Sequence, residues 1–164
     1  MGTAYNADEI LSIAIKIEEN GAAFYRRAAR LQLSEEESKE LLTLAAMEDD
    51  HKRKFQSMRQ ALPAQSTETA PFDPYEESDL YLFAVSDTHG GEGAPEMAAT
   101  LTGTETIEEV LWTAVGLEKK SILFYVGLRD RVDQAEKPTL DSIIAEEKRH
   151  VANLSRMIRK RTSQ

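Results

Sequence analysis

Apolar residues recur three and four positions apart in four separate segments of the chain, which is the spacing of an amphipathic helix. In the first segment the repeat is carried by Ile10, Ala14, Ile17, Gly21, Phe24, Ala28 and Leu31. The four predicted helices cover residues 7–31, 34–60, 106–130 and 138–160. The pattern therefore predicts an all-α protein, which we take as a single domain over residues 1–164.

Three of the predicted helix starts also carry local signals. Ser34 is followed three positions later by Glu37, and Thr106 by Glu109, which is the arrangement of a capping box. Pro138 suits the first turn of a helix, where no backbone N–H is needed.

The connection between the second and third helices spans about 40 residues, 63–103, and contains four prolines and a glycine-rich run. A short helix is expected near residues 75–85, where several apolar side chains need burial. Simple up-and-down bundles use short loops throughout. One long crossover therefore predicts an antiparallel four-helix bundle of the ferritin-like type.

The two halves of the chain repeat their chemistry. Glu18 and Tyr25 recur 100 positions later as Glu118 and Tyr125. Two Glu-x-x-His motifs recur 99 positions apart, and they are Glu48 with His51 and Glu147 with His150. Two helical hairpins related by a pseudo-two-fold axis would bring such equivalent residues around a common centre.

Each predicted helix has one acidic residue whose neighbours three, four and seven positions away are mainly small, apolar or aromatic. These four inward-facing acids are Glu18, Glu48, Glu118 and Glu147. The adjacent acids have charged or polar neighbours and are expected to face outward, and they are Glu19, Asp49, Asp50 and Glu146.

Four buried carboxylates without compensating charge would cost several kcal/mol each, so cations are expected among them. Side chains three positions apart lie on the same face of a helix, so His51 can reach the same metal ions as Glu48, and His150 the same ions as Glu147. Carboxylates with imidazoles suit iron, manganese or zinc. A single Glu-x-x-His is usually a solvated surface pair, but two copies with two matching glutamates favour a two-metal site.

Tyr25 and Tyr125 are expected in the core, with a hydrogen bond to a ligand.

Composition narrows the possible functions. The chain has 20 basic and 29 acidic residues and a net charge of −9, which argues against binding nucleic acid or anionic membranes. It has no cysteine, which excludes disulfides, thiolate catalysis and iron–sulfur or rubredoxin-type centres within this sequence. Neither a leader peptide nor an apolar stretch of roughly 18 residues is evident, so we expect a cytoplasmic protein.

With these residues in place, the chain resembles the rubrerythrin branch of the ferritin-like superfamily over residues 7–61 and 105–161. The Glu-to-Tyr spacing of seven and the phrases EKKSILFY and EEKRH carry the resemblance. It implies a di-iron centre in which Glu48 and Glu147 bridge the metals. The implied terminal ligands, one carboxylate and one imidazole for each iron, are Glu18, His51, Glu118 and His150.

The resemblance further implies an oxidoreductase that reduces peroxide or oxygen with electrons from a separate donor, working as a homodimer. Rubrerythrins carry a rubredoxin domain and an additional glutamate one turn along the third helix. This sequence has no cysteine, and Ser121 and Ile122 stand at those steps. Two alternatives stay open: a ferritin-like iron-binding, ferroxidase or storage protein, and a non-catalytic metal-binding bundle that acts as an interaction module.

Overall fold

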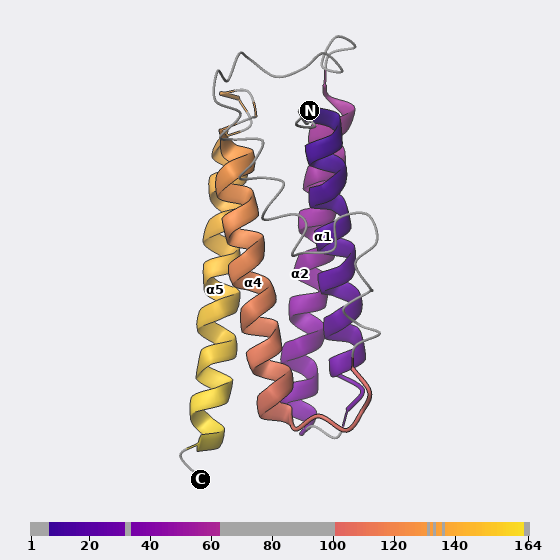
Figure 1. The fold of residues 1–164 in the computed structure, drawn as a ribbon, viewed down its shortest axis with the longest axis vertical. Helices are drawn as coiled ribbons and strands as arrows, with labels where there is room; N and C mark the ends of the chain where they lie inside the picture. Colours follow the sequence, from indigo (N-terminus) through magenta and orange to yellow (C-terminus); the bar gives the residue numbers. More distant parts are fainter. Residues whose placement is uncertain are drawn as a thin grey trace, which may run out of the picture.

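A computed structural model describes residues 7–31, 34–62, 101–130, 132, 134–135 and 137–162. These residues form four α-helices and no strand, so the predicted all-α four-helix bundle is confirmed (Figure 1). The helices are α1 (Ala7–Ala28), α2 (Glu35–Gln60), α4 (Ile107–Arg129) and α5 (Lys137–Thr162).

The observed helix ends differ from the predicted ones by up to three residues. The largest difference is in α1, which ends at Ala28 rather than at position 31. The chain beyond it turns, with the Arg30 N–H donating to the Arg27 carbonyl at 3.1 Å. The short helix expected at residues 75–85 lies outside the described residues, as does nearly all of the predicted crossover.

Both predicted capping boxes are present. Ser34 accepts from the Glu37 N–H at 3.2 Å, and the Glu37 carboxylate accepts from the Ser34 N–H at 3.0 Å. Thr106 and Glu109 repeat this exchange at the start of α4, at 3.2 and 2.8 Å. Because each box satisfies N–H groups that a helix start leaves without partners, both helices begin where the sequence indicates.

The helices associate as two hairpins, α1 with α2 and α4 with α5, which lie side by side so that α1 faces α4 and α2 faces α5 (Figure 1). The paired helices run antiparallel, whereas α2 and α4 run in the same direction. The C-terminal end of α2 and the N-terminal end of α4 therefore lie at opposite ends of the bundle, which agrees with a long connection between them.

A layer of polar residues divides the apolar core into two clusters, one on each side of the middle of the bundle. All four helices contribute to both clusters. The cluster nearer the C-terminal end of α1 includes Phe24, Ala28, Leu41, Leu44, Val110, Leu111, Leu154 and Ile158. The other includes Ile10, Leu11, Ala14, Phe55, Phe124, Leu128, Leu140 and Ile143.

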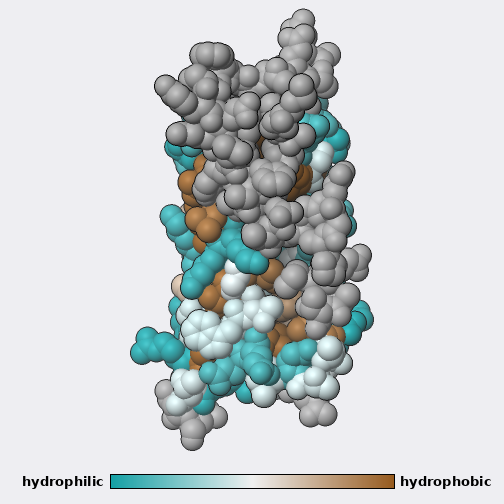
Figure 2. Space-filling model, in the orientation of Figure 1, coloured by the Kyte–Doolittle hydropathy of each residue, from teal (hydrophilic) through white to brown (hydrophobic). Residues whose placement is uncertain are grey.

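The described part of the surface mixes hydrophilic and hydrophobic side chains (Figure 2). The large apolar side chains exposed there include Trp112, Leu123 and Val126, all on α4, so that helix is apolar on more than its buried face. Among the described helices, none combines the length and the apolar character needed to cross a membrane.

Candidate metal centre

The polar layer in the middle of the bundle is made by the six residues that the sequence analysis selects. Each side chain is at most 5% exposed, although each is ionisable. α1 and α4 contribute one glutamate each, whereas α2 and α5 contribute a glutamate and a histidine each. The six residues are Glu18, Glu48, His51, Glu118, Glu147 and His150.

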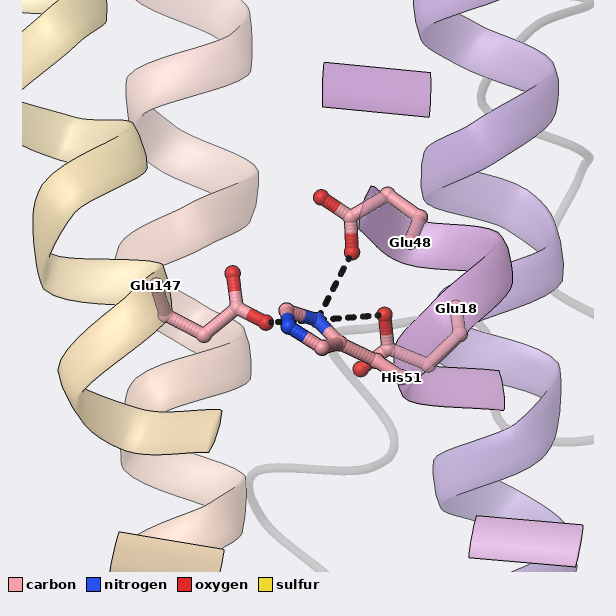
Figure 3. A group of neighbouring side chains, drawn as sticks. All are labelled: Glu18, Glu48, His51 and Glu147. Atoms are coloured by element: carbon pink, nitrogen blue, oxygen red, sulfur yellow. Dashed lines mark ion pairs between the residues drawn. The ribbon is translucent and has the colours of Figure 1, made fainter. Parts of the chain in front are cut away.

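The six side chains form two overlapping groups of four whose ligand atoms lie within 4.8 Å of one another. Glu48 and Glu147 belong to both groups. The first group adds Glu18 and His51, and Figure 3 shows its three carboxylates directed toward the His51 ring. The second group adds Glu118 and His150. This overlap is the arrangement that two neighbouring cations with shared carboxylates require.

The distances around His51 and His150 show how the shared carboxylates are divided. His51 Nδ1 lies 2.8 Å from Glu147 Oε1 and 3.6 Å from Glu48 Oε2. His150 Nδ1 lies 3.1 Å from Glu147 Oε2 and 3.2 Å from Glu48 Oε1. Each shared carboxylate thus offers one oxygen to either side, and the two imidazole rings stack with centroids 5.7 Å apart.

Glu18 and Glu118 complete the two sides. Glu18 Oε2 lies 3.5 Å from His51 Nδ1, and Glu118 Oε1 lies 3.5 Å from His150 Nδ1. Every buried side-chain nitrogen or oxygen atom that lacks a hydrogen bond in the described part of the chain belongs to this cluster. Buried polar atoms are rarely left in that state. Carboxylate oxygens and imidazole nitrogens that converge without hydrogen bonds are a donor set that fits two divalent cations.

Burial raises the pKa values of two of these carboxyls, and the surrounding carboxylates raise those of both histidines. Burial raises the pKa of the Glu18 and Glu118 carboxyls well above their usual range. Burial opposes the charged form of His150 too, but the surrounding carboxylates outweigh it and raise its pKa to about 12. The pKa of His51 is raised for the same reason. Protons on these groups offset the negative charge, and cations that bind there must displace them.

Two tyrosines hold the carboxylates of Glu18 and Glu118. The Tyr25 hydroxyl donates to Glu118, and the Tyr125 hydroxyl donates to Glu18. The sequence predicts a hydrogen bond from each tyrosine to a candidate ligand without indicating which one, and both bonds run from one hairpin to the other. Each hairpin therefore positions a candidate ligand of the other.

One sequence-based expectation is wrong. The sequence predicts that Glu146 faces outward, but its side chain is only 17% exposed and its Oε2 lies 2.8 Å from His51 Nε2. The polar neighbours of Glu146 along α5 are consistent with a surface position. Its contact with His51 arises from the packing of α5 against α2, which neighbours along one helix do not report. The sequence does carry one signal of this difference. The repeat of 99 positions pairs Glu146 with Met47, so a carboxylate stands in one half where the other half has a thioether.

A cavity of about 20 Å³ lies beside the cluster, between α1 and α4. Gly21 lines it, and a Cβ at that position would lie in van der Waals contact with the Glu48 side chain, 3.4 Å from its Cγ. The residues that line the cavity are Ile17, Asn20, Gly21, Tyr25, Glu48, Leu117, Glu118 and Ser121.

The fold and the site together define a class: a four-helix bundle with a buried carboxylate and histidine centre that could hold two metal ions. The chain is similar to a solved structure of a Thermotoga maritima protein assigned as a ferritin-like diiron-carboxylate protein. The identity is 28%, the TM-score is 0.74, and the match covers 95% of this chain and 96% of that one. No family model and no curated protein sequence matches. The structural likeness supports the ferritin-like superfamily.

Proposed function

We propose that this protein is a di-iron oxidoreductase that reduces hydrogen peroxide or dioxygen, as rubrerythrins do, with electrons from a separate donor. The observation that carries the proposal is the division of the two shared carboxylates. Glu48 and Glu147 each present one oxygen toward His51 and the other toward His150, which is how a carboxylate bridges two cations.

The charge of the cluster supports two divalent cations. Four buried glutamates carry four negative charges when ionised, and two divalent ions balance them. Imidazole and carboxylate donors suit iron, manganese and zinc alike, so the donor set alone does not select the metal. The assignment of the Thermotoga maritima protein as a diiron-carboxylate protein favours iron.

The size of the adjacent cavity supports a small substrate. Each side of the centre has four protein side chains, so a six-coordinate ion would keep open positions unless carboxylates bind through both oxygens. A volume of about 20 Å³ is enough for roughly one water-sized molecule. Peroxide and dioxygen are of this size class, whereas an organic substrate would not fit beside Glu48 and Glu118.

The chain's own residues would position the metals and shield the site. When bound, a pair of ferrous ions would supply the two electrons that, with two protons, reduce hydrogen peroxide to two water molecules. A separate reductant would then return the iron to the ferrous state. The apolar clusters above and below exclude bulk water. Tyr25 and Tyr125 hold their protons on the hydroxyl, because burial raises their pKa values, and so keep Glu118 and Glu18 in place.

The proposal is tested by loading the full chain anaerobically with Fe(II), removing the excess, and measuring bound iron and peroxide consumption. We expect two iron ions per chain and ferric absorption after peroxide is added. Glu48→Ala removes a shared ligand, so its loss of activity should exceed the roughly 10- to 100-fold effect of losing a supporting hydrogen bond. Its iron content should fall below two per chain.

Glu19→Ala is the matched control, because Glu19 adjoins Glu18 but is exposed and lies 3.7 Å from Lys52. It should behave like the unaltered chain. Failure of the unaltered chain to retain iron, or normal activity in Glu48→Ala, would contradict the proposal. Light scattering adds a second criterion, since we expect a homodimer, whereas a closed cage would favour iron storage.

A further inference from the structure

The two imidazoles of the centre differ in what holds their outer nitrogens. Both rings direct Nδ1 toward the carboxylates, so Nε2 faces away from them. His51 Nε2 lies 2.8 Å from Glu146 Oε2. His150 Nε2 is buried and has no hydrogen bond in the described part of the chain. The two sides of an otherwise symmetric site are therefore supported unequally.

The sequence repeat locates the origin of this difference. The offset of 99 positions that relates Glu48 to Glu147 and His51 to His150 also relates Met47 to Glu146. α5 thus provides a carboxylate where α2 provides a thioether, which is only a weak acceptor. The repeat is kept at the metal-facing residues and broken at the supporting position.

Glu146 is held in place from several directions. Its Oε1 accepts from the Ser142 hydroxyl at 3.3 Å and lies 3.5 Å from Lys54 Nζ. Arg149 approaches the same oxygen at 3.9 Å. These contacts leave Oε2 directed at His51, so the bond to the imidazole is a fixed feature of the site.

A carboxylate that accepts from Nε2–H keeps the proton on that nitrogen and the lone pair on Nδ1, and it makes the imidazole a stronger ligand. We propose that Glu146 is a positioning residue that makes the two metal positions unequal. The cation at His51 binds first and more tightly, and the cation at His150 binds second. This inference rests on the proposed two-metal centre.

The test is an anaerobic calorimetric titration of the full chain with Fe(II) alone. The unaltered chain should bind two ions in separate steps whose dissociation constants differ by about tenfold or more. Glu146→Met copies the other half of the repeat and should weaken the first step by about 10- to 100-fold, leaving the second step unchanged. Glu146→Gln keeps a hydrogen-bond acceptor but loses the charge, so it should give an intermediate value.

Two further variants separate positioning from a general structural effect. Arg53→Gln removes an exposed cation of the same helical turn that pairs with Asp50 instead of Glu146, and should leave both steps unchanged. Met47→Glu supplies the missing carboxylate and should tighten the second step, which keeps the inference testable even if Glu146→Met does not fold. Circular dichroism checks the helical content of every variant.

The possible failures are distinct. Two ions bound with the same intrinsic affinity, or binding steps that neither Glu146→Met nor Met47→Glu alters, would overturn the inference and leave the proposed function standing. If the unaltered chain binds no Fe(II), the proposed function itself fails.

Discussion

Tyr25 and Tyr125 illustrate how single side chains support the centre. Each hydroxyl is buried and donates to a glutamate of the opposite hairpin, Tyr25 to Glu118 and Tyr125 to Glu18. Burial, together with the charge of the glutamate, raises both tyrosine pKa values well above the usual range. The hydroxyls therefore stay protonated and act as permanent donors.

Removing one of these donors should destabilise the metal-free protein. Tyr25→Phe leaves a buried Glu118 oxygen without its donor, which typically costs about 1–3 kcal/mol of unfolding free energy. Urea denaturation at neutral pH measures the change. Thr43→Val, which removes an exposed hydroxyl bonded to the Lys39 carbonyl, should alter stability by no more than about 0.5 kcal/mol. Equal stability of Tyr25→Phe and the unaltered chain would show that the hydroxyl is dispensable.

At the scale of the elements, Glu37 joins the start of α2 to the end of α5. Its carboxylate accepts from the Ser34 N–H and hydroxyl within the capping box and also pairs with Arg161. Burial tends to raise the pKa of Glu37, but the hydrogen bonds from Arg161 and Ser34 outweigh it and hold the pKa below its ordinary value of 4.5. The charged form is therefore the one that the folded state favours.

The stabilisation by Glu37 should depend on pH. A pKa that is lower in the folded than in the unfolded state stabilises the fold above pH 4.5 and loses this effect as pH falls through the folded value. Glu37→Gln should therefore cost about 1 kcal/mol at neutral pH and progressively less below pH 4.5. Urea denaturation at neutral pH and below pH 4.5 measures the change in unfolding free energy.

Glu36→Gln is the control for that comparison, because Glu36 lies in the same helical turn but is 76% exposed in its side chain. It should change stability little at either pH. A Glu37→Gln effect of equal size at neutral and acid pH would mean that its charge is not what stabilises the helix ends.

At the scale of the whole molecule, the polar layer interrupts the core at its centre. Six ionisable side chains from all four helices lie between two apolar clusters. Mutual repulsion among the carboxylates opposes packing there, and cations would convert it into attraction between the two hairpins. Metal binding should therefore act as a cross-link of the bundle.

Loading with a divalent ion should raise thermal stability. Manganese, a redox-stable substitute for iron, should add about 2.7 kcal/mol per site when its free concentration is 100 times the dissociation constant. Thermal unfolding followed by circular dichroism, with manganese or with a chelator, measures the shift. Magnesium prefers oxygen ligands and retains water, so at equal concentration it should have a smaller effect. Identical unfolding with manganese and with the chelator would contradict a structural role for the metal.

Much of this architecture could be predicted because helical periodicity is a local property. The direction of a side chain around its own helix follows from the neighbours three and four positions away. That is enough to separate buried Glu18 from exposed Glu19, and to place Glu48 with His51 and Glu147 with His150 on inward faces. The sequence thus determined four helices and the candidate ligands that each one directs inward.

Only the tertiary structure decided which residues meet across the helix interfaces. Tyr25 bonds to Glu118 rather than to a residue of its own helix, and Glu146 reaches His51 from a position whose own neighbours are polar. Both contacts depend on the rotation and axial offset of one helix against another. Those quantities arise from packing among all four helices, whereas the periodicity of a single segment reports only the face that it buries.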